Sequence, residues 1–167
     1  VTENGMLFAN AGFVRGFDSY DEVTDKLRED TPGWAAEVVD RGIAWLQKYP
    51  QEQFFLFLHT YQVHEPYVAP EGYDQFPLPE DTPYRKYQQA YKAEVLYTDH
   101  QMGRLLAALK PLGLSQNTVV IFTSDHGEAF GEDGKLTHGY SLHEEAMRIP
   151  LLMRVPGRMQ SGLRITA

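Results

Sequence analysis

The sequence predicts an α/β fold, a mostly parallel sheet flanked by helices, in one partial domain over residues 1–167. Two observations support this prediction. Short apolar runs alternate with two long helical patterns in the order strand, helix, strand, helix, strand, loop, strand, which is typical of α/β layers. The uncharged run Thr118–Phe122 is β-branched and aromatic, as in a strand buried on both faces in the middle of a parallel sheet.

The composition is that of a globular protein without a nucleic-acid-binding face. Of 167 residues, 43% are hydrophobic and 23% are charged, which suits a domain with its own core. The net charge is -8, and no basic stripe is present to neutralise phosphates. A small anionic substrate remains compatible, because a metal ion or a histidine cluster can reverse the local field. The sequence has no cysteine, which excludes disulfides, thiolate metal sites and a cysteine nucleophile.

In the first half of the chain, the sequence predicts a helix followed by a strand. Thr31 and Pro32 form a helix start, with Thr as N-cap and Pro at the first helical position. Apolar residues recur at helical spacing over Ala35–Tyr49, and Pro50 ends the pattern. The run Phe54–Leu58 (FFLFL) then predicts a second buried strand.

In the second half, a long helix and further strands follow a loop. Residues 68–83 are rich in proline and predict a loop. The segment Tyr84–Leu109 predicts a long helix, because its apolar and aromatic residues recur at spacings of three and four. The run Ile149–Val155 (IPLLMRV) predicts a strand that Pro156 and Gly157 end. The predicted helix stripe comprises Tyr84, Tyr87, Tyr91, Val95, Thr98, Met102, Leu105 and Leu109.

Titratable side chains follow the predicted strands. Because the carboxyl ends of parallel strands meet at one edge of a sheet, these side chains are expected to converge there. Aspartate and histidine together suit Mg, Mn, Ca or Zn, and further histidines or a lysine can hold an oxyanion or protonate a leaving group. Gly127 is expected to let the chain turn sharply, so that the carboxylate and imidazole before it face the crevice. In chain order the set is His59, His64, Asp125, His126, Lys135, His138 and His143.

Several of these residues also have a purely structural interpretation. In that case Asp125 caps a following helix, and His126 is an exposed turn residue. His59 directly ends a predicted buried strand, and we favour a hydrogen-bonded core histidine there. Lys135 follows the polar turn residues 132–134 and is then a solvated turn lysine.

Motifs in order along the chain carry a family resemblance. They are Phe55–Tyr67, ending in HTYQVHEPY, then Tyr97–Leu106 (YTDHQMGRLL), Ser124–Glu128 (SDHGE), Thr137–Leu142 (THGYSL) and Glu144–Leu151 (EEAMRIPL). Together they resemble the sulfatase family of the alkaline-phosphatase superfamily. The resemblance implies an alkaline-phosphatase-like fold and metal-dependent hydrolysis of sulfuric esters.

The resemblance also implies roles for individual residues. Asp125 matches a metal-ligand aspartate of the family, and His126 takes the next metal-ligand position. His64 matches the histidine that contacts the ester group and assists departure of the leaving group. His138 lies near the place of a substrate-binding lysine in many sulfatases, and Lys135 is the alternative source of that charge. The implied cofactors are one divalent metal ion, with Ca, Mn or Mg favoured, and a formylglycine.

Three functions compete at this point. The first is hydrolysis of a small-molecule or glycan sulfate ester. The second is hydrolysis of a phosphonate or phosphodiester, since His126 stands where many sulfatases have Asn and where relatives that cleave those esters have His. The third is a non-catalytic α/β fragment, because the chain has no Cys/Ser-x-Pro-x-Arg motif, in which the family forms its formylglycine. We therefore expect a middle-to-C-terminal part of a sulfatase catalytic domain, with the formylglycine upstream of Val1.

The 167-residue chain by itself is expected to show no sulfatase turnover, because the motif of the nucleophile is missing from it. It is also expected to self-associate, since a partial sheet leaves an open edge and uncovered apolar surface. Aryl sulfate assays with added divalent metal, run beside light scattering at high concentration, check both expectations. Metal-dependent turnover would contradict the first, and a clean monomer would contradict the second.

Overall fold

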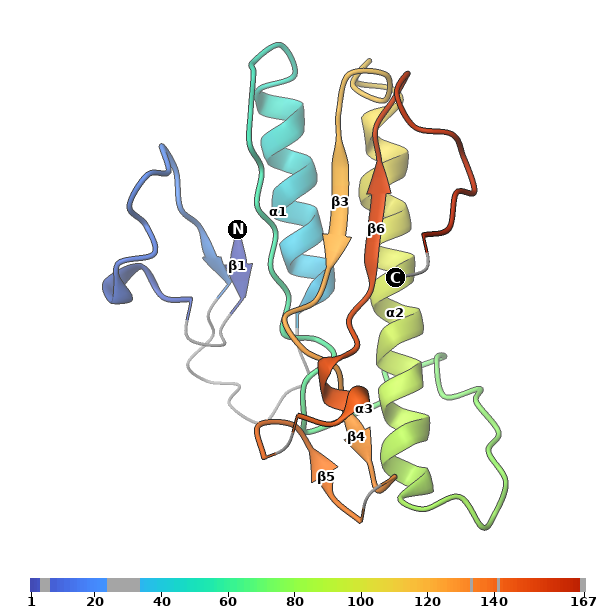
Figure 1. Ribbon diagram of the computed structural model, residues 1–167. Coiled ribbons are helices and arrows are strands. Elements are labelled where there is room, and N and C mark those ends of the chain that lie inside the picture. Colours follow the sequence, from blue (N-terminus) through green and yellow to red (C-terminus); the bar gives the residue numbers. More distant parts are fainter. Residues whose placement is uncertain (4–6, 24–33, 133, 141, 166–167) are drawn as a thin grey trace. The chain divides into compact units, whose positions relative to one another are not determined.

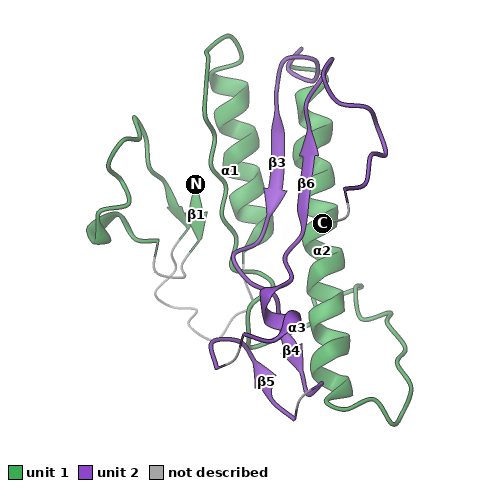
Figure 2. Ribbon diagram, viewed as in Figure 1, with its two compact units in different colours: residues 1–112 green, residues 113–167 purple. Residues whose placement is uncertain are grey.

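The computed structural model describes residues 1–3, 7–23, 34–132, 134–140 and 142–165, and its fold is α/β (Figure 1). The chain divides into two compact units, Val1–Leu112 and Gly113–Ala167 (Figure 2). The single catalytic domain expected over residues 1–167 stays a prediction.

The described part of the first unit holds two long helices and a short parallel strand pair. The strand β1 (Thr2–Glu3) pairs with β2 (Glu22–Val23). A 3-10 helix, η1 (Ala9–Ala11), lies between these strands in the sequence. The helices α1 (Ala35–Lys48) and α2 (Arg85–Leu109) pack against each other.

Helix α1 follows the predicted helical period. Its buried residues are Ala35, Val38, Val39, Gly42 and Leu46. Spacings of three and four residues place them on one apolar face. The helix ends at Lys48, just ahead of Pro50, which cannot continue it. The predicted start at Thr31 and Pro32 lies outside the described residues.

The run Phe54–Leu58 does not form the buried strand that the sequence predicts. An isolated bridge ties only the residue after it to β1. Phe55 and Phe57 are 77% and 43% exposed. Leu58, in contrast, lies against Gly42 of α1, where a Cβ would come within 2.9 Å of Leu58 Cδ1. The run therefore packs on α1 through Leu58 and stacks Phe55 on Phe17, but two of its phenylalanines stay exposed, whereas five consecutive apolar residues suggested burial on both faces.

The long predicted helix is confirmed as α2, which has 25 residues. The predicted stripe is only partly the buried face: Thr98 and Leu109 are buried, but Tyr87 and Val95 are 52% and 43% exposed. The other buried residues of α2 are Ala93, Glu94 and Gln101. Hydrophobic spacing could not locate this face, because it carries polar side chains. Among the described residues no helix combines the length and the apolar character that a membrane span requires.

The described part of the second unit contains two antiparallel strand pairs. The strand β3 (Val120–Thr123) pairs with β6 (Leu151–Arg154) over four residues each. The strand β4 (Ala129–Phe130) pairs with β5 (Leu136–Thr137), and the short helix α3 (Glu144–Met147) precedes β6.

The strands predicted around residues 118–122 and 149–155 are confirmed as β3 and β6, but their setting differs from the prediction. Within the described residues β3 has one partner, which runs antiparallel, so the expected mostly parallel sheet is not seen there. Ile121 is 59% and Leu152 63% exposed, so neither strand is buried on both faces. An uncharged β-branched run indicates a strand, but it does not indicate the direction of the neighbouring strand.

Glu94 is a fully buried carboxyl group on α2. Its relative exposure is 0%. Its Oε1 accepts a hydrogen bond from the backbone N–H of Val68 at 3.0 Å, while its Oε2 has no hydrogen-bond partner in the part of the chain that the structure describes. Burial disfavours the charged form and raises the pKa of Glu94 to about 8, although the hydrogen bond from Val68 acts in the opposite direction. The group is therefore neutral at pH 7.

The free energy of unfolding is expected to fall as pH rises from 4.5 to 8. The unfolded chain loses the Glu94 proton near the ordinary pKa of 4.5, whereas the folded chain keeps it to about 8. Across this window the unfolded state binds fewer protons. The folded state is therefore most stable, as far as Glu94 is concerned, below the unfolded pKa, and this stability is lost as the pH rises toward the folded pKa. The free energy of unfolding changes by at most about 1.4 kcal/mol per pH unit.

The substitution Glu94→Gln is expected to remove this slope, because an amide does not titrate. Urea unfolding of the wild type and E94Q between those pH values checks it. Glu71→Gln, at an exposed residue, is the control and should keep the slope. Parallel stability curves for E94Q and the wild type would contradict the assignment.

Candidate functional site

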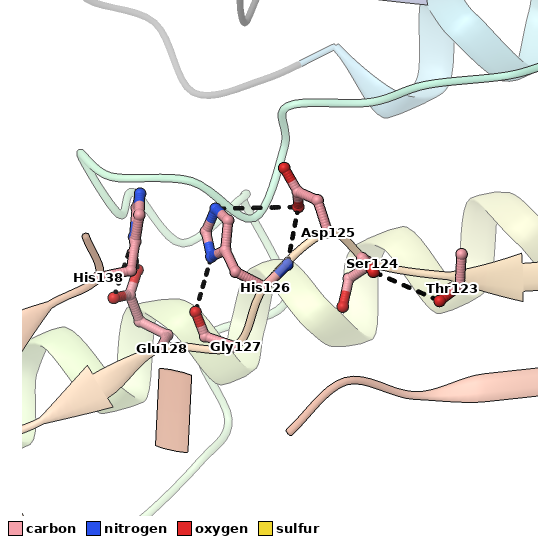
Figure 3. Close-up of polar contacts among 7 residues, drawn as sticks. All are labelled: Thr123, Ser124, Asp125, His126, Gly127, Glu128 and His138. Atoms are coloured by element: carbon pink, nitrogen blue, oxygen red, sulfur yellow. Dashed lines mark hydrogen bonds and ion pairs between the residues drawn. The ribbon is translucent and has the colours of Figure 1, made fainter. Parts of the chain in front are cut away.

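The turn that follows β3 presents a carboxylate and an imidazole side by side (Figure 3). The side chain of Asp125 is 84% exposed, and its Oδ1 accepts a hydrogen bond from the backbone N–H of His126 at 3.1 Å. The Nε2 atom of His126 lies 3.8 Å from the same oxygen. The carboxylate is thus held beside the ring of the residue that follows it.

The tautomer of His126 follows from its second ring contact. Its Nδ1 lies 2.7 Å from the carbonyl oxygen of Gly127. Because a carbonyl oxygen only accepts, Nδ1–H is the donor. In the neutral ring the lone pair is therefore on Nε2, the atom beside Asp125. A carbonyl that orients an imidazole in this way is the usual support of a metal-ligating histidine.

A second imidazole stacks on this one. The rings of His138 and His126 have centroids 3.8 Å apart and an interplanar angle of 24°. Nδ1 of His138 lies 3.3 and 3.2 Å from the two carboxylate oxygens of Glu128, whose side chain is only 3% exposed. The β4–β5 hairpin, with Ala129 opposite Thr137, returns the chain so that residues 128 and 138 meet.

Glu128 is a residue of the cluster to which the sequence assigned no role, although it belongs to the SDHGE motif. An ionised carboxylate only accepts, so Nδ1–H of His138 donates to it. The neutral His138 ring then carries its lone pair on Nε2, as His126 does. The sequence signal that could have paired Glu128 with His138 is the glycine-containing stretch 131–134 between them, which is typical of a hairpin turn.

Gly127 acts through close packing rather than through a sharp turn. It is not among the residues with a positive φ, so the predicted reason for this glycine is wrong. A Cβ placed there would overlap the backbone carbonyl oxygen of Glu145 and would lie 3.0 Å from that of Arg148. Its N–H also donates to the carbonyl oxygen of Ala146 at 2.7 Å. Glycine is required because the turn lies directly against α3.

The other two predicted residues of this unit lie on exposed turns. Lys135 is exposed between β4 and β5, and its side chain has no polar partner in the described part of the chain. Its carbonyl oxygen accepts the N–H of Gly131 at 2.8 Å. His143 is exposed and directly precedes α3. The structure thus brings together Asp125, His126 and His138, and no contact among the described residues joins Lys135 to them.

His64 lies in the first unit, on the loop after the run 54–58. Its Nδ1 lies 2.7 Å from the carbonyl oxygen of Glu65, so Nδ1–H donates and the neutral ring has its lone pair on Nε2. The ring stacks on Tyr61 with a centroid distance of 4.1 Å. His59 has the structural place that the sequence favoured, since its Nδ1–H donates to the carbonyl oxygen of Glu3 at 2.9 Å.

The donor chemistry of Asp125 and His126 fits part of a divalent metal site. A carboxylate oxygen and an imidazole nitrogen 3.8 Å apart can share one ion, since such ligands lie about 2.0–2.6 Å from it. Within the described residues, no group of three or more His, Asp or Glu side chains could hold a metal ion. The pair could therefore supply two ligands of such a site but not a complete one.

Comparison with known proteins decides the family. The model of the Sulfatase family matches residues 2–166. The chain belongs to the sulfatase family. The resemblance drawn from the motifs is thereby confirmed. Iduronate 2-sulfatase of Mus musculus is 50% identical to this sulfatase chain over 82 residues, which are 49% of the chain and 14% of the mouse protein. The chain thus spans only a small part of the length of that relative.

Two solved structures resemble this sulfatase chain. One comes from work on the metabolism of multiple glycosaminoglycans by Bacteroides thetaiotaomicron. It has a TM-score of 0.64 at 28% identity, over 75% of this chain and 30% of that chain. The lipoteichoic acid synthase LtaP of Listeria monocytogenes has a TM-score of 0.73 at 22% identity, over 96% of this chain and 44% of that chain. The likeness to LtaP concerns the fold alone.

Replacing Gly127 by Ala is expected to destabilise the second unit of this sulfatase by about 1–3 kcal/mol, because the new methyl group meets backbone oxygens that cannot swing away. Gly103→Ala is the matched control. Gly103 lies within α2 and has nothing within 4 Å of a Cβ, so alanine should stabilise the helix by roughly 1 kcal/mol. Denaturant unfolding of both variants checks this, and a G127A protein as stable as the wild type would refute the packing against α3.

Proposed function

We propose that the protein hydrolyses sulfuric esters. The observation that carries the proposal is the Asp125–His126 pair, two metal-type donors 3.8 Å apart just after β3. The family match over residues 2–166 supports it. In the net reaction, water supplies a hydroxyl oxygen to sulfur, the S–O bond to the alcohol breaks, and the leaving oxygen takes up a proton.

Asp125 and His126 are the residues that would hold a divalent cation, with Ca, Mn or Mg favoured by the carboxylate. When bound, such an ion polarises the sulfuryl oxygens and lowers the pKa of the nucleophile, which we expect to be a formylglycine. The backbone N–H of His126 orients the carboxylate, and the Gly127 carbonyl orients the imidazole. Both donor atoms are therefore held by the turn itself.

His138 is the residue that we expect to bind the charge that develops on the sulfuryl oxygens. Its Nδ1–H donates to Glu128 and fixes the ring, and we assign the contact with the substrate to Nε2. With Nε2 protonated, the ring donates to an anionic oxygen, and the carboxylate of Glu128 balances its positive charge. Lys135 is the alternative cation for this role.

His64 is the residue that we expect to protonate the leaving oxygen. Because its Nδ1–H is held by the Glu65 carbonyl, the transferable proton resides on Nε2. The stack against Tyr61 restricts rotation of the ring. A proton donor of fixed orientation is most valuable when the leaving alcohol is a weak acid.

The substrate class that we propose is a sulfate ester of a small molecule or a glycan. Support comes from iduronate 2-sulfatase, which is 50% identical over the matched region, and from the structure solved in work on glycosaminoglycan metabolism. For the whole protein we propose that β3 and β6 belong to a larger, mostly parallel sheet flanked by helices, of the alkaline-phosphatase-like kind.

One observation favours a second candidate function, hydrolysis of phosphonates or phosphodiesters. His126 follows Asp125 at the position where many sulfatases have Asn, and histidine there is typical of relatives that cleave those esters. The same side chains would serve either ester. Paired aryl sulfates and aryl phosphonates with the same leaving group separate the candidates, since the native class should have the higher kcat/KM.

Asp125→Asn and His126→Ala are each expected to lower kcat/KM for aryl sulfates by on the order of 100-fold or more, because each removes a metal ligand. The measurement uses the protein expressed from its complete reading frame. Chelation of the wild type should have the same effect and should reverse when Ca, Mn or Mg is added. Calorimetry with each metal alone should show weaker binding in both variants.

His100→Ala, at an exposed histidine of α2, is the control and should leave both activity and metal affinity unchanged. Full activity of the Asp125→Asn protein with unaltered metal affinity would overturn the metal site. A preference for the phosphonate would favour the second candidate. No turnover of either ester would overturn the assignment as a hydrolase.

A further inference from the structure

The loop that carries His64, residues 60–68, is held at both ends by buried carboxyl groups. Glu3 of β1 holds its start, and Glu94 of α2 holds its end. We propose that Glu94 is a positioning residue for the reaction: by holding the backbone of Val68, it determines where His64 stands. This inference rests on the proton-donor role proposed above for His64.

At the start of the loop, Glu3 accepts two hydrogen bonds on one oxygen. Its Oε2 accepts from the hydroxyl of Thr60 at 2.7 Å and from the N–H of Tyr61 at 2.8 Å. Its Oε1 accepts from the N–H of Trp34, the residue before α1, at 2.8 Å. Glu3 is only 3% exposed. The first residues of the loop are thus fixed to both β1 and the start of α1.

At the end of the loop, Glu94 and two tyrosines hold the chain to α2. Glu94 Oε1 accepts the N–H of Val68 at 3.0 Å. The ring of Tyr67 packs edge-on against Tyr91 and Tyr87, at centroid distances of 5.7 and 6.4 Å. Tyr91 lies three residues before Glu94 on the same helix. The aromatic contacts hold the side chain of one loop residue, and the carboxyl group holds the backbone of the next.

Between these anchors, His64 is partly exposed. Its ring stacks on Tyr61, whose N–H is bound by Glu3. In the other direction, four residues of chain lead from His64 to Val68, whose N–H is bound by Glu94. Loss of the hydrogen bond to Val68 therefore leaves this end of the loop held to α2 by the Tyr67 ring alone, with the backbone of Val68 no longer fixed.

The position of Glu94 favours a positioning role over simple packing. The side chain is fully buried, and burial of a carboxyl group costs free energy that an apolar side chain would not cost. Within the described part of the chain, neither its Oε2 nor the Oγ1 of Thr98 one helical turn further on has a hydrogen-bond partner. The one polar contact that the carboxyl group makes among the described residues is with Val68. A leucine could fill the same space but could not accept that N–H.

Loss of the acceptor at residue 94 is expected to move His64 away from the leaving oxygen. A poor leaving group needs the proton in the transition state, whereas a good one departs without it. For poor leaving groups kcat should fall by on the order of 100-fold, the loss that a misplacement of about 1 Å can cause. For good leaving groups the fall should be less than about 3-fold, since proton transfer then contributes little.

The experiment measures kcat for aryl sulfates of rising leaving-group pKa, with the protein expressed from its complete reading frame. Glu94→Ala and the milder Glu94→Asp, whose shorter side chain draws the acceptor back, should steepen the dependence of log kcat on leaving-group pKa. Glu94→Gln keeps a carbonyl oxygen that can accept the N–H of Val68, so this variant should retain the wild-type dependence of log kcat on leaving-group pKa. Lys92→Ala, at an exposed residue of the same helix, is the control.

His64→Ala separates this inference from the proposed function. It should steepen the slope by itself, and its combination with Glu94→Ala should be no steeper. If His64→Ala steepens the slope but the Glu94 variants change only Tm, Glu94 is merely structural and the inference fails while the role of His64 stands. If His64→Ala leaves the slope unchanged, both claims fail. Should Glu94→Ala not fold, the slope of the Glu94→Asp protein decides.

Discussion

The buried carboxylate of Glu3 is the contact on which the first unit depends. Three donors from two distant parts of the chain meet on its two oxygens: the N–H of Trp34, the hydroxyl of Thr60 and the N–H of Tyr61. The partners lie 31, 57 and 58 residues away, so one side chain joins β1, the start of α1 and the histidine-bearing loop. A buried donor that loses its acceptor costs about 1–3 kcal/mol. Through the side chain of Glu3, a strand of only two residues can therefore hold a much larger region in place.

Three histidines, one in the first unit and two in the second, share one physical arrangement of the imidazole. His64 and His126 each donate Nδ1–H to the carbonyl oxygen of the next residue, at 2.7 Å in both cases, and His138 donates to the carboxylate of Glu128. In every case Nδ1–H is the donor, so the lone pair of the neutral ring lies on Nε2. For His64 and His126 this orientation comes from neighbours in the sequence. These two hydrogen bonds therefore need no acceptor from a distant part of the chain.

The features that could be predicted from the sequence are those that depend on the spacing of residues along the chain. The helical period located α1 and α2, and the Asp125–His126 pair after β3 could be recognised because its members are adjacent. What could not be predicted depends on partners far away in the chain. A five-residue apolar run does not show which of its side chains meet a helix and which stay exposed, as at Phe54–Leu58, and a β-branched run does not show that its neighbour is antiparallel. The roles of Glu3 and Glu94 lie in contacts 26 to 58 residues away, which no local pattern contains.

The contact between Gly127 and the carbonyl oxygens at α3 restricts any redesign of this site. Changes at Asp125, His126 or His138 alter the donor atoms without requiring the backbone of α3 to move. Any side chain at residue 127 would instead push the turn away from that helix and would displace the donors on either side. A library meant to vary the proposed metal ligands should therefore keep glycine at 127 and place its diversity at 125 and 126. The residue without a side chain thus determines which of its neighbours can be mutated freely.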